Sequence, residues 1–276
     1  MPELPEVEYV ARLLDERVSG RRIRSAELRR ARLAPHSAPD DFAARLKNSA
    51  VNFVHRRGKN ILFDLDNGRT LLTHLRMSGR FLLLSGQLDD PKFTHAVFHF
   101  HDGMRLAFDD QRHFGLMKVI ETVDMNLDRS LATLAPEPFS DEFGIDYLRS
   151  RLAVSGRSLK EFLLDQSKVC GLGNIYASEA MFRARLSPRR LARNVPRTRL
   201  DLLHASIRNV LNEALQLAGG KVPDPIVIGE GVYGNGTRAD WHVYDREDEP
   251  CVACSSSIRR IRQGQRSTYY CPKCQR

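Results

Sequence analysis

The feature that most constrains this chain is a pair of Cys-x-x-Cys motifs near its C-terminus. Cys251 and Cys254 form the first motif, and Cys271 and Cys274 form the second after sixteen intervening residues. Each motif can hold a metal ion from a tight turn, and together they complete the tetrahedral thiolate shell that suits zinc. Four protein ligands leave no open position, so the spacing predicts one structural Zn²⁺ ion in a small finger. The fifth cysteine, Cys170, is expected to be a small buried side chain.

The composition favours a polyanionic partner. Forty-three Lys and Arg residues against 34 Asp and Glu give a formal net charge of +9. Such a charge suits DNA, RNA or an anionic membrane, and does not choose among them. No apolar stretch reaches the roughly 20 residues of a membrane-spanning helix, so we expect a soluble protein. Between the cysteine motifs lie four arginines that a two-stranded finger could offer to phosphate: Arg259, Arg260, Arg262 and Arg266.

The first eight residues, Met-Pro-Glu-Leu-Pro-Glu-Val-Glu, crowd two prolines and three carboxylates together. Pro5 fits the first turn of a helix, and Glu6 suits the positive end of the helix dipole. If Met1 is removed, Pro2 becomes a secondary amine, and an α-amino group titrates near pH ~7.7–8.0. Its attack on a sugar C1′ would give an iminium, and Glu3 could carry protons. Composition alone favours the simpler interpretation, a proline-started helix with an acidic first turn.

From residue 21 to about residue 120 the pattern is mostly β. Short apolar or alternating runs are separated by turn signals such as Asn67-Gly68 and Asp102-Gly103. The predicted strands cover residues 51–54, 61–65, 71–75, 81–84, 96–100 and 104–108. Six or more short strands with tight turns indicate a two-layer β-sandwich or a flattened barrel, with the N-terminal helix at its flank.

From residue 141 onward the pattern becomes helical. Ser158 and Glu161 form a capping box, and Asn174 is a good N-cap for a helix over residues 175–185. The glycine-kinked turn before Asn174 would present free backbone N–H groups, which suit a phosphate, although a plain helical hairpin fits the spacing equally well. The last predicted helix is expected to be core, because its apolar residues recur at helical spacing: Leu200, Leu203, Ile207, Val210, Ala214 and Leu217.

The chain is therefore expected to have an α+β fold. The expected domains are an N-terminal β-sandwich over residues 1–122 and a linker over 123–140, which has no sustained period. A helical domain over 141–240 and a zinc finger over 241–276 follow.

Two stretches carry a family resemblance. The run Pro-Glu-Leu-Pro-Glu-Val-Glu at the start and the run Gly-Leu-Gly-Asn-Ile-Tyr-Ala-Ser-Glu at residues 171–179 resemble signatures of the formamidopyrimidine-DNA glycosylases. These bacterial enzymes excise oxidised purines through an N-terminal proline. The basic strand, the loops and the finger follow in the family's order, so the resemblance covers nearly the whole chain. It implies that the β-sandwich over 1–122 is catalytic and that the domain over 141–240 binds DNA through a helix-two-turns-helix element and carries a lesion-recognition loop. The implied activity is that of a base-excision repair glycosylase and AP lyase. Its partner would be damaged double-stranded DNA, cut by β,δ-elimination.

The resemblance also implies roles for individual residues. Pro2 would attack the sugar, Glu3 would move protons, and Glu6 would support the terminus. Lys59, in the run Arg-Arg-Gly-Lys, would contact DNA beside the amine. The other implied DNA contacts are Met77, Arg112 and Phe114, which would fill the gap left by the extruded nucleotide, and Lys160, Asn174 and Arg266, which would hold phosphates.

The chain departs from the family pattern at two places. His113 stands where an arginine is more usual, which leaves one phosphate contact open. Between Lys221 and Asp240, a glycine-rich run replaces the family's loop ending in Gly-Tyr-Phe-Gln. Of the properties that the resemblance implies, the preference for particular lesions therefore has the least support.

Two other functions are compatible with these motifs. An endonuclease VIII type of glycosylase would prefer oxidised pyrimidines, but its start usually reads Pro-Glu-Gly-Pro-Glu, and this chain has Leu4. A non-catalytic zinc-finger DNA-binding protein could keep the same scaffold, but Pro2, Glu3 and Lys59 are intact. For the enzyme we expect no small-molecule cofactor, no membrane partner, a monomer, and a bacterial cytoplasmic location at the nucleoid.

Overall fold

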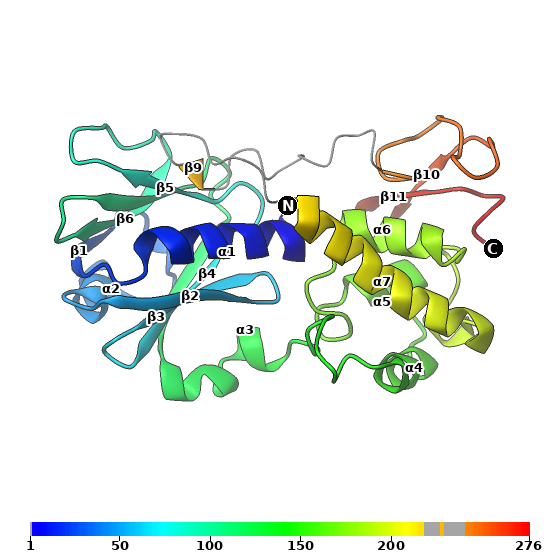
Figure 1. Ribbon diagram of the computed structural model, residues 1–276, viewed down its shortest axis with the longest axis horizontal. Coiled ribbons are helices and arrows are strands. Elements are labelled where there is room, and N and C mark those ends of the chain that lie inside the picture. The colour runs from blue at the N-terminus through cyan, green and yellow to red at the C-terminus, as the bar shows by residue number, and fades with distance from the viewer. Residues whose placement is uncertain (1, 218–226, 229–240) are drawn as a thin grey trace. The chain divides into compact units, whose positions relative to one another are not determined.

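The computed structural model describes residues 2–217, 227–228 and 241–276, which form two compact units (Figure 1). The N-terminal unit comprises residues up to 132 together with residues 227–228. The C-terminal unit comprises residues 133–217 and 241–276. Among the described residues, no helix combines the length and the hydrophobicity that crossing a bilayer requires.

Two antiparallel sheets and the helix α1 (Leu4–Val18) build the N-terminal unit. One sheet has the strand order β1 (Ile23–Leu28), β6 (Thr94–Phe100), β7 (Arg105–Asp109), β5 (Arg80–Leu84) and β9 (Val227–Ile228). The other has the order β2 (Val51–Arg57), β3 (Asn60–Leu65), β4 (Arg69–His74) and β8 (Leu116–Glu121). The connections hold η1 (Ala31–Leu33), α2 (Pro39–Leu46), η2 (Thr122–Leu127) and α3 (Arg129–Ala132).

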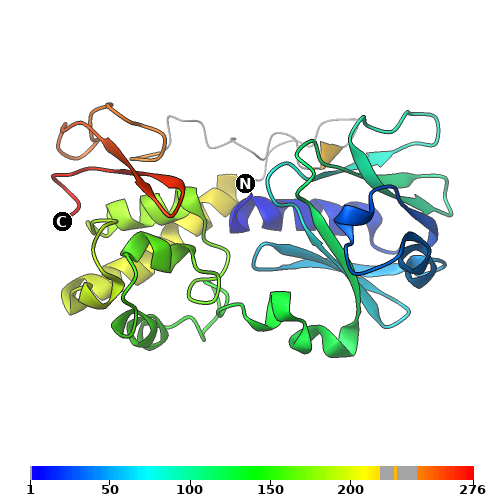
Figure 2. The same cartoon turned by 180° about the vertical axis from the view of Figure 1, so that it is seen from behind.

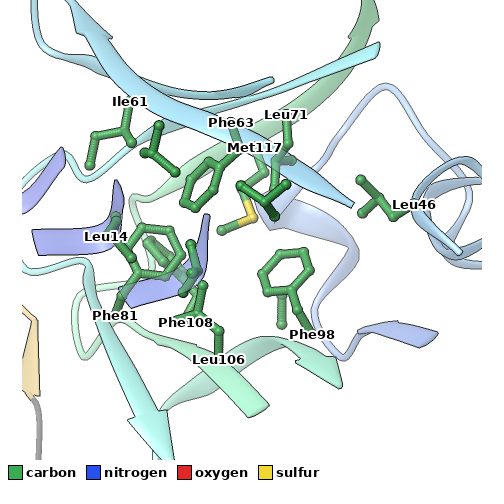
Figure 3. Packing of buried hydrophobic residues seen from close by; sticks show 14 of the residues in the cluster. Leu14, Leu46, Ile61, Phe63, Leu71, Phe81, Phe98, Leu106, Phe108 and Met117 are labelled. Atoms are coloured by element: carbon green, nitrogen blue, oxygen red, sulfur yellow. The ribbon is translucent and has the colours of Figure 1, made fainter. Parts of the chain in front are cut away.

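The core of this unit lies between the two sheets (Figure 3). Phe63 of the four-stranded sheet meets Phe81 of the five-stranded sheet edge-on, with ring centroids 5.6 Å apart. Phe108 packs edge-on against Phe81 at 5.1 Å, and Leu14 brings α1 into the same core. Burial of each such side chain contributes about 1.5–3 kcal/mol. The sandwich is therefore a firm support for the loops at its edges.

Hydrogen bonding fixes α1 along the edge strand β2. The Asp15 carboxylate accepts hydrogen bonds from the backbone N–H of Val54 at 2.7 Å and from the Ser19 hydroxyl at 2.6 Å. The helix ends at Val18, and Gly20 follows with a positive φ of 81°. The start of α1 thus has a defined position on the sandwich.

The C-terminal unit is helical and ends in a hairpin. Its elements are α4 (Ile145–Ala153), α5 (Leu159–Leu164), α6 (Asn174–Arg183), η3 (Ala192–Asn194), α7 (Arg197–Leu217), β10 (Arg259–Gln263) and β11 (Arg266–Tyr270). Figure 2 shows this unit from behind, with the red hairpin reaching toward the helices. At the hairpin tip, a Cβ built on Gly264 would lie 3.6 Å from the Glu161 carboxylate of α5. The hairpin therefore packs against the start of α5.

The structure confirms the α+β class and each of the six predicted strands. It adds β1, β8 and the short helix α2, which the sequence pattern did not indicate. The strand β1 has the sequence Ile-Arg-Ser-Ala-Glu-Leu, whose charged residues mask the alternation. The segment 123–140, expected to be a linker, contains η2 and α3, and the units divide after Ala132. Residues 227–228 pair with β5 in the N-terminal unit, whereas the expected boundaries assign them to the helical domain.

Two local expectations in the helical half were wrong. Asn174 is the first residue of α6, and Gly173 is the N-cap, because the extended backbone continues through that glycine. In α7, Ala214 is only half-buried and Leu217 is exposed, since the packed part of the helix ends earlier. The capping box of Ser158 and Glu161 is confirmed.

Candidate nucleic-acid interface and zinc centre

The first turn of α1 holds the N-terminal candidates. Pro2 and Glu3 are both buried, and Glu3 is the N-cap of the helix with an extended backbone. The Glu3 backbone N–H donates to the Glu6 carboxylate at 2.7 Å. Glu6 therefore orients the peptide that joins residues 2 and 3 to the helix, which is the supporting position expected from the sequence.

A second contact ties α1 to the strand that leads to Lys59. The Glu8 carboxylate accepts from Arg56 Nε at 2.8 Å and from Arg12 Nε at 2.7 Å. Burial alone would raise the pKa of Glu8, but the two guanidinium groups outweigh it and lower the pKa. Lys59 lies three residues after Arg56, in the turn before β3, and is 6% exposed. The Glu8–Arg56 pair thus positions this turn against the helix.

The loops after β4 and β7 carry the expected gap-filling residues. Met77 and Phe114 are large apolar side chains that are 39% and 46% exposed. The guanidinium of Arg112 lies over the Phe114 ring, 5.3 Å from its centroid. Exposed apolar side chains beside a stacked cation suit insertion into a base stack, where they offset the cost of extrusion.

Asp110 joins these two loops and was not singled out from the sequence. One of its oxygens accepts from the Ser78 hydroxyl at 2.5 Å and from the backbone N–H of Arg112 at 3.2 Å. The other accepts from the backbone N–H of Gly115 at 2.7 Å. The carboxylate is completely buried, so its hydrogen bonds are strong and the loops are held in one arrangement.

Two glycines allow the loops to approach the core. A Cβ on Gly115 would lie 2.7 Å from the Phe108 ring, and a Cβ on Gly79 would lie 2.6 Å from the Leu75 carbonyl oxygen. Any side chain at these positions would therefore displace the loops.

His74 supports the same region: desolvation, with Arg76 and Lys59 nearby, lowers the pKa of His74 to about 3. Its neutral Nδ1 accepts from the backbone N–H of Arg76 at 3.0 Å.

The turn between α5 and α6 is fixed by a glutamine. The Gln166 side chain donates to the Leu164 and Leu172 carbonyls at 3.0 and 2.9 Å and accepts from the Gly171 backbone N–H at 3.0 Å. Gly171 has a φ of 77°, which a residue with a side chain rarely adopts. The start of α6 is thus presented by a rigid turn, as a phosphate site requires.

Asn174 and Lys160 meet at the start of α6. The Asn174 side-chain amide donates to the Ser267 carbonyl of β11 at 2.9 Å, next to the exposed Arg266. Lys160 differs from its expected place, because it is fully buried. Its ammonium donates to the Asn174 carbonyl at 2.8 Å and to the Ser178 hydroxyl at 2.7 Å. A buried ammonium cannot reach a phosphate directly in this conformation, and it instead secures the first turn of α6.

The hairpin that carries Arg266 has a two-residue turn. Gly264 and Gln265 have φ values of 51° and 63°, the left-handed conformation of a type I′ turn, and Gln263 pairs with Arg266 across it. This turn places Arg266 at the first position of β11, with its side chain exposed.

The four cysteines meet as the sequence predicts. Their sulfur atoms all lie within 4.8 Å of one another, with 3.9 Å between Cys251 and Cys274 and 3.5 Å between Cys254 and Cys271. A tetrahedral shell with metal–sulfur bonds of about 2.3 Å separates sulfurs by roughly 3.8 Å. Hydrogen bonding from Ser256 lowers the pKa of Cys254 to about 6, whereas burial raises the pKa of Cys271 and raises that of Cys274 to about 12. The site fits one structural Zn²⁺ ion, and Cys170 is buried elsewhere.

A buried glutamate connects α6 to the segment before the finger. Glu179 is 1% exposed and accepts from the backbone N–H groups of His242, Val243 and Tyr244 at 2.9–3.0 Å. His242 Nδ1 adds a contact at 3.1 Å. Burial would raise the pKa of Glu179, but these donors outweigh it and lower the pKa. Sequence reasoning missed this residue, although a carboxylate on an otherwise apolar helix was a usable signal.

Each unit therefore collects its own candidates. The N-terminal unit contains seven of the candidate residues: Pro2, Glu3, Glu6, Lys59, Met77, Arg112 and Phe114. The C-terminal unit contains Lys160, Asn174, Arg266 and the four cysteines of the zinc site. Most of the expected loop 221–240 lies outside the described residues. Together the fold and the sites define a two-unit protein that joins a β-sandwich to a helical unit with a four-cysteine zinc finger.

Comparison with known proteins makes this class specific. Residues 1–117 match the formamidopyrimidine-DNA glycosylase N-terminal domain, residues 134–224 match its H2TH domain, and residues 248–276 match a zinc finger found in FPG and IleRS. The chain belongs to the formamidopyrimidine-DNA glycosylase family.

Individual relatives align over the full chain. The formamidopyrimidine-DNA glycosylase of Bacillus subtilis (strain 168) is 40% identical over 276 residues, which cover 100% of this chain and 99% of that protein. The Dinoroseobacter shibae protein of the same name is 42% identical with 100% coverage of both chains. Among solved structures, the complex between Lactococcus lactis Fpg and an abasic site containing DNA has a TM-score of 0.90 at 30% identity, covering 99% of each chain.

Proposed function

We propose that this protein is a bifunctional DNA glycosylase and AP lyase of base-excision repair, acting on oxidised purines such as 8-oxoguanine and formamidopyrimidines in duplex DNA. The observation that carries the proposal is the full-length similarity to named formamidopyrimidine-DNA glycosylases. The solved relative from Lactococcus lactis is bound to DNA containing an abasic site in one structure and to Fapy-dG containing DNA in another.

The chemistry starts at Pro2 after removal of Met1. The neutral secondary amine forms a bond to C1′, and the electron pair of the glycosidic bond leaves with the base, which takes up a proton. Glu3 donates a proton to the ring oxygen as the sugar opens, which gives the iminium. The iminium acidifies the C2′ proton, so the 3′ phosphate leaves by β-elimination and the 5′ phosphate by δ-elimination. A one-nucleotide gap remains.

The DNA-binding residues orient the damaged nucleotide relative to the Pro2 amine. In the proposal, Lys59, Asn174 and Arg266 hold the phosphate at the lesion, so that C1′ stays in line with the amine, and this fixed geometry lowers the barrier. Met77, Arg112 and Phe114 occupy the space of the extruded nucleotide. The Zn²⁺ ion keeps the finger folded and takes no part in the reaction. We further propose a monomer in the bacterial cytoplasm, associated with the nucleoid through DNA binding.

Borohydride trapping on a duplex with one 8-oxoguanine opposite cytosine tests the proposal. The expected result is a covalent adduct that mass spectrometry places on Pro2. Pro2→Gly should still bind a duplex with a tetrahydrofuran abasic analogue but lose most of the adduct. Pro35→Gly, the same change in an exposed turn, should trap normally. Undiminished trapping by Pro2→Gly would remove Pro2 from its role.

Substrate comparison separates the proposal from its alternatives. One solved Lactococcus lactis complex contains an oxidised pyrimidine, so thymine glycol is the necessary comparison substrate. Faster release of thymine glycol than of 8-oxoguanine would favour the endonuclease VIII type. Binding without any trapped adduct, on either lesion or on an abasic site, would favour a DNA-binding protein without activity.

A further inference from the structure

The loop between β7 and β8 contains a histidine that contacts a second histidine on β6. His113 Nδ1 lies 2.9 Å from His95 Nε2, and the two rings are stacked with centroids 5.0 Å apart. Phe93 packs edge-on against His113 at 6.0 Å. His95 is 2% exposed, His113 is half-buried, and His113 has a φ of 58°. The His113 ring is therefore held in one orientation between Arg112 and Phe114.

The hydrogen bonds around His95 fix which nitrogens carry protons. The Asp110 backbone bonds the His95 ring. Because the Asp110 N–H already donates to the Phe93 carbonyl at 3.0 Å, the Asp110 carbonyl is the group that accepts from His95. Burial lowers the pKa of His95, so its ring is neutral near pH 7 and has one N–H, which this bond uses. His95 Nε2 is then an acceptor, and His113 Nδ1 must donate to it.

This arrangement decides what the other nitrogen of His113 can do. A neutral His113 with its proton on Nδ1 has a lone pair on Nε2, which would repel a phosphate oxygen. Protonation converts Nε2 into a donor and adds a positive charge. Among the described residues, Nε2 of His113 has no hydrogen-bond partner. The ring can therefore bind an anion only as an imidazolium.

The other charged groups that the structure describes around the two histidines do not bind Nε2 of His113, so this nitrogen can contact a phosphate. The Asp110 carboxylate is engaged by Ser78, Arg112 and Gly115. Arg30, after β1, is bound through its backbone to the His95 carbonyl at 3.2 Å and faces the buried ring. The Arg112 guanidinium lies over Phe114 in the same loop, and the Lys92 ammonium lies 5.5 Å from the Phe93 ring centroid. The Asp109 carboxylate, beside Phe93, accepts from the Phe93 backbone N–H at 3.0 Å and from Arg80 Nε at 3.0 Å. Both carboxylates are thus engaged by donors of the protein, and Arg30, Arg112 and Lys92 contribute positive charge, which suits a polyanion.

We propose that His113 binds a backbone phosphate of the DNA duplex as an imidazolium, so that DNA binding takes up one proton. The proposal rests on the proposed function, because Arg112 and Phe114 bring this loop to the DNA. The phosphate stabilises the charged ring, so affinity rises as the pH falls and this gain is lost as the pH rises.

The test is the affinity for a duplex with a tetrahydrofuran site, measured by fluorescence anisotropy between pH 6.0 and 8.0 at constant ionic strength. The wild-type protein should bind about three- to tenfold more tightly at pH 6.0, as expected for uptake of one proton over the range in which histidine titrates. His113→Gln should bind weakly at both pH values, and His113→Arg tightly at both. His36→Gln, which alters an exposed histidine of the same unit, should behave as wild type.

Salt dependence gives an independent measurement. At pH 6.0 the slope of log affinity against log salt should be about 0.9 smaller in His113→Gln than in wild type, because one phosphate contact is lost. At pH 8.0 the two slopes should agree. An unchanged pH dependence and an unchanged slope in His113→Gln would overturn the proposal.

Failure of the proposed function would look different. In that case the wild-type protein would form no trapped adduct and would not distinguish the tetrahydrofuran duplex from undamaged duplex. A pH-dependent difference between wild type and His113→Gln on undamaged duplex would still support phosphate binding by His113. If wild type and His113→Gln also showed no pH-dependent difference on undamaged duplex, the proposed function and the phosphate contact of His113 would both be overturned.

Discussion

The side-chain amide of Asn174 donates a hydrogen bond to the Ser267 carbonyl at 2.9 Å, which links the first turn of α6 to the zinc-finger hairpin. A carboxamide has two N–H groups, so one remains for a phosphate. Arg266 precedes Ser267 in the chain and is exposed. The contact therefore brings Asn174, a proposed phosphate ligand from α6, to the backbone position next to Arg266, the ligand proposed from the hairpin.

Asn174→Ala should weaken binding to a duplex with a tetrahydrofuran site by about tenfold to a hundredfold. The substitution removes a hydrogen bond to a charged group, worth about 1.5–3 kcal/mol, and also the contact that aligns β11. Anisotropy titration measures the loss. Asn194→Ala, an exposed asparagine of the same unit, is the control and should bind normally. An equal loss in both variants would mean that the effect is not specific to the site.

Lys160→Met should weaken DNA binding without changing its salt dependence. The buried ammonium supports the Asn174 carbonyl and the Ser178 hydroxyl, so its removal loosens the first turn of α6. A direct phosphate contact would instead reduce the salt slope by about 0.9. Arg266→Ala, which removes an exposed cation, is the comparison and should show that reduction. A reduced slope in Lys160→Met would restore the direct contact expected from the sequence.

Removal of the zinc ion should abolish tight DNA binding while most of the helical signal remains. The finger has few apolar residues of its own, and its small core includes Cys251 and Cys271, so the metal holds the hairpin that carries Arg266. Metal analysis should give one zinc ion per chain in wild type and none in Cys251→Ser. Cys170→Ser, the fifth cysteine, should keep its zinc and its affinity. Full affinity after chelation would contradict a structural role for the metal.

The features that could be predicted from the sequence are those that depend on residues close together in the chain. The cysteine spacing, the capping box at Ser158 and the apolar strands are local patterns, and the structure confirms them. Asp110, Glu8 and Glu179 act through partners far along the chain, such as Val243 for Glu179, and no local period marks such pairs. The same limit explains Lys160: a lysine near a glycine-rich turn resembles a phosphate ligand, and only tertiary packing shows that it is enclosed.

Glu179→Gln should lower the melting temperature of the protein at neutral pH by about 3–10 °C, because a buried carboxylate with several donors is worth about 1–3 kcal/mol. The pKa of Glu179 is lowered in the folded state, so its stabilisation is present above the unfolded value of about 4.5 and is lost as the pH falls through the folded pKa. The difference between wild type and Glu179→Gln should therefore shrink below about pH 4.5. Glu16→Gln, at an exposed position of α1, is the control and should change the melting temperature far less at every pH.

Asp110→Asn should impair base excision more than strand cleavage at a preformed abasic site. The buried carboxylate accepts from Ser78 and Arg112 through one oxygen and from Gly115 through the other. An amide can replace only one of these oxygens, and its NH₂ group would oppose an N–H donor. The loops that carry Met77 and Phe114 would then lose their fixed arrangement, and in the proposed mechanism extrusion of an intact nucleotide depends on these loops.

Single-turnover rates measure this effect. We expect Asp110→Asn to be slower by about tenfold on an 8-oxoguanine duplex, as the loss of roughly 1.4 kcal/mol would give, and slower by less than threefold on an abasic duplex. Asp89→Asn, an exposed carboxylate of the same unit, should leave both rates unchanged. Equal slowing of the two reactions would show that Asp110 supports the fold of the unit as a whole. A loss confined to the 8-oxoguanine duplex ties the buried carboxylate to the loops that replace the extruded nucleotide.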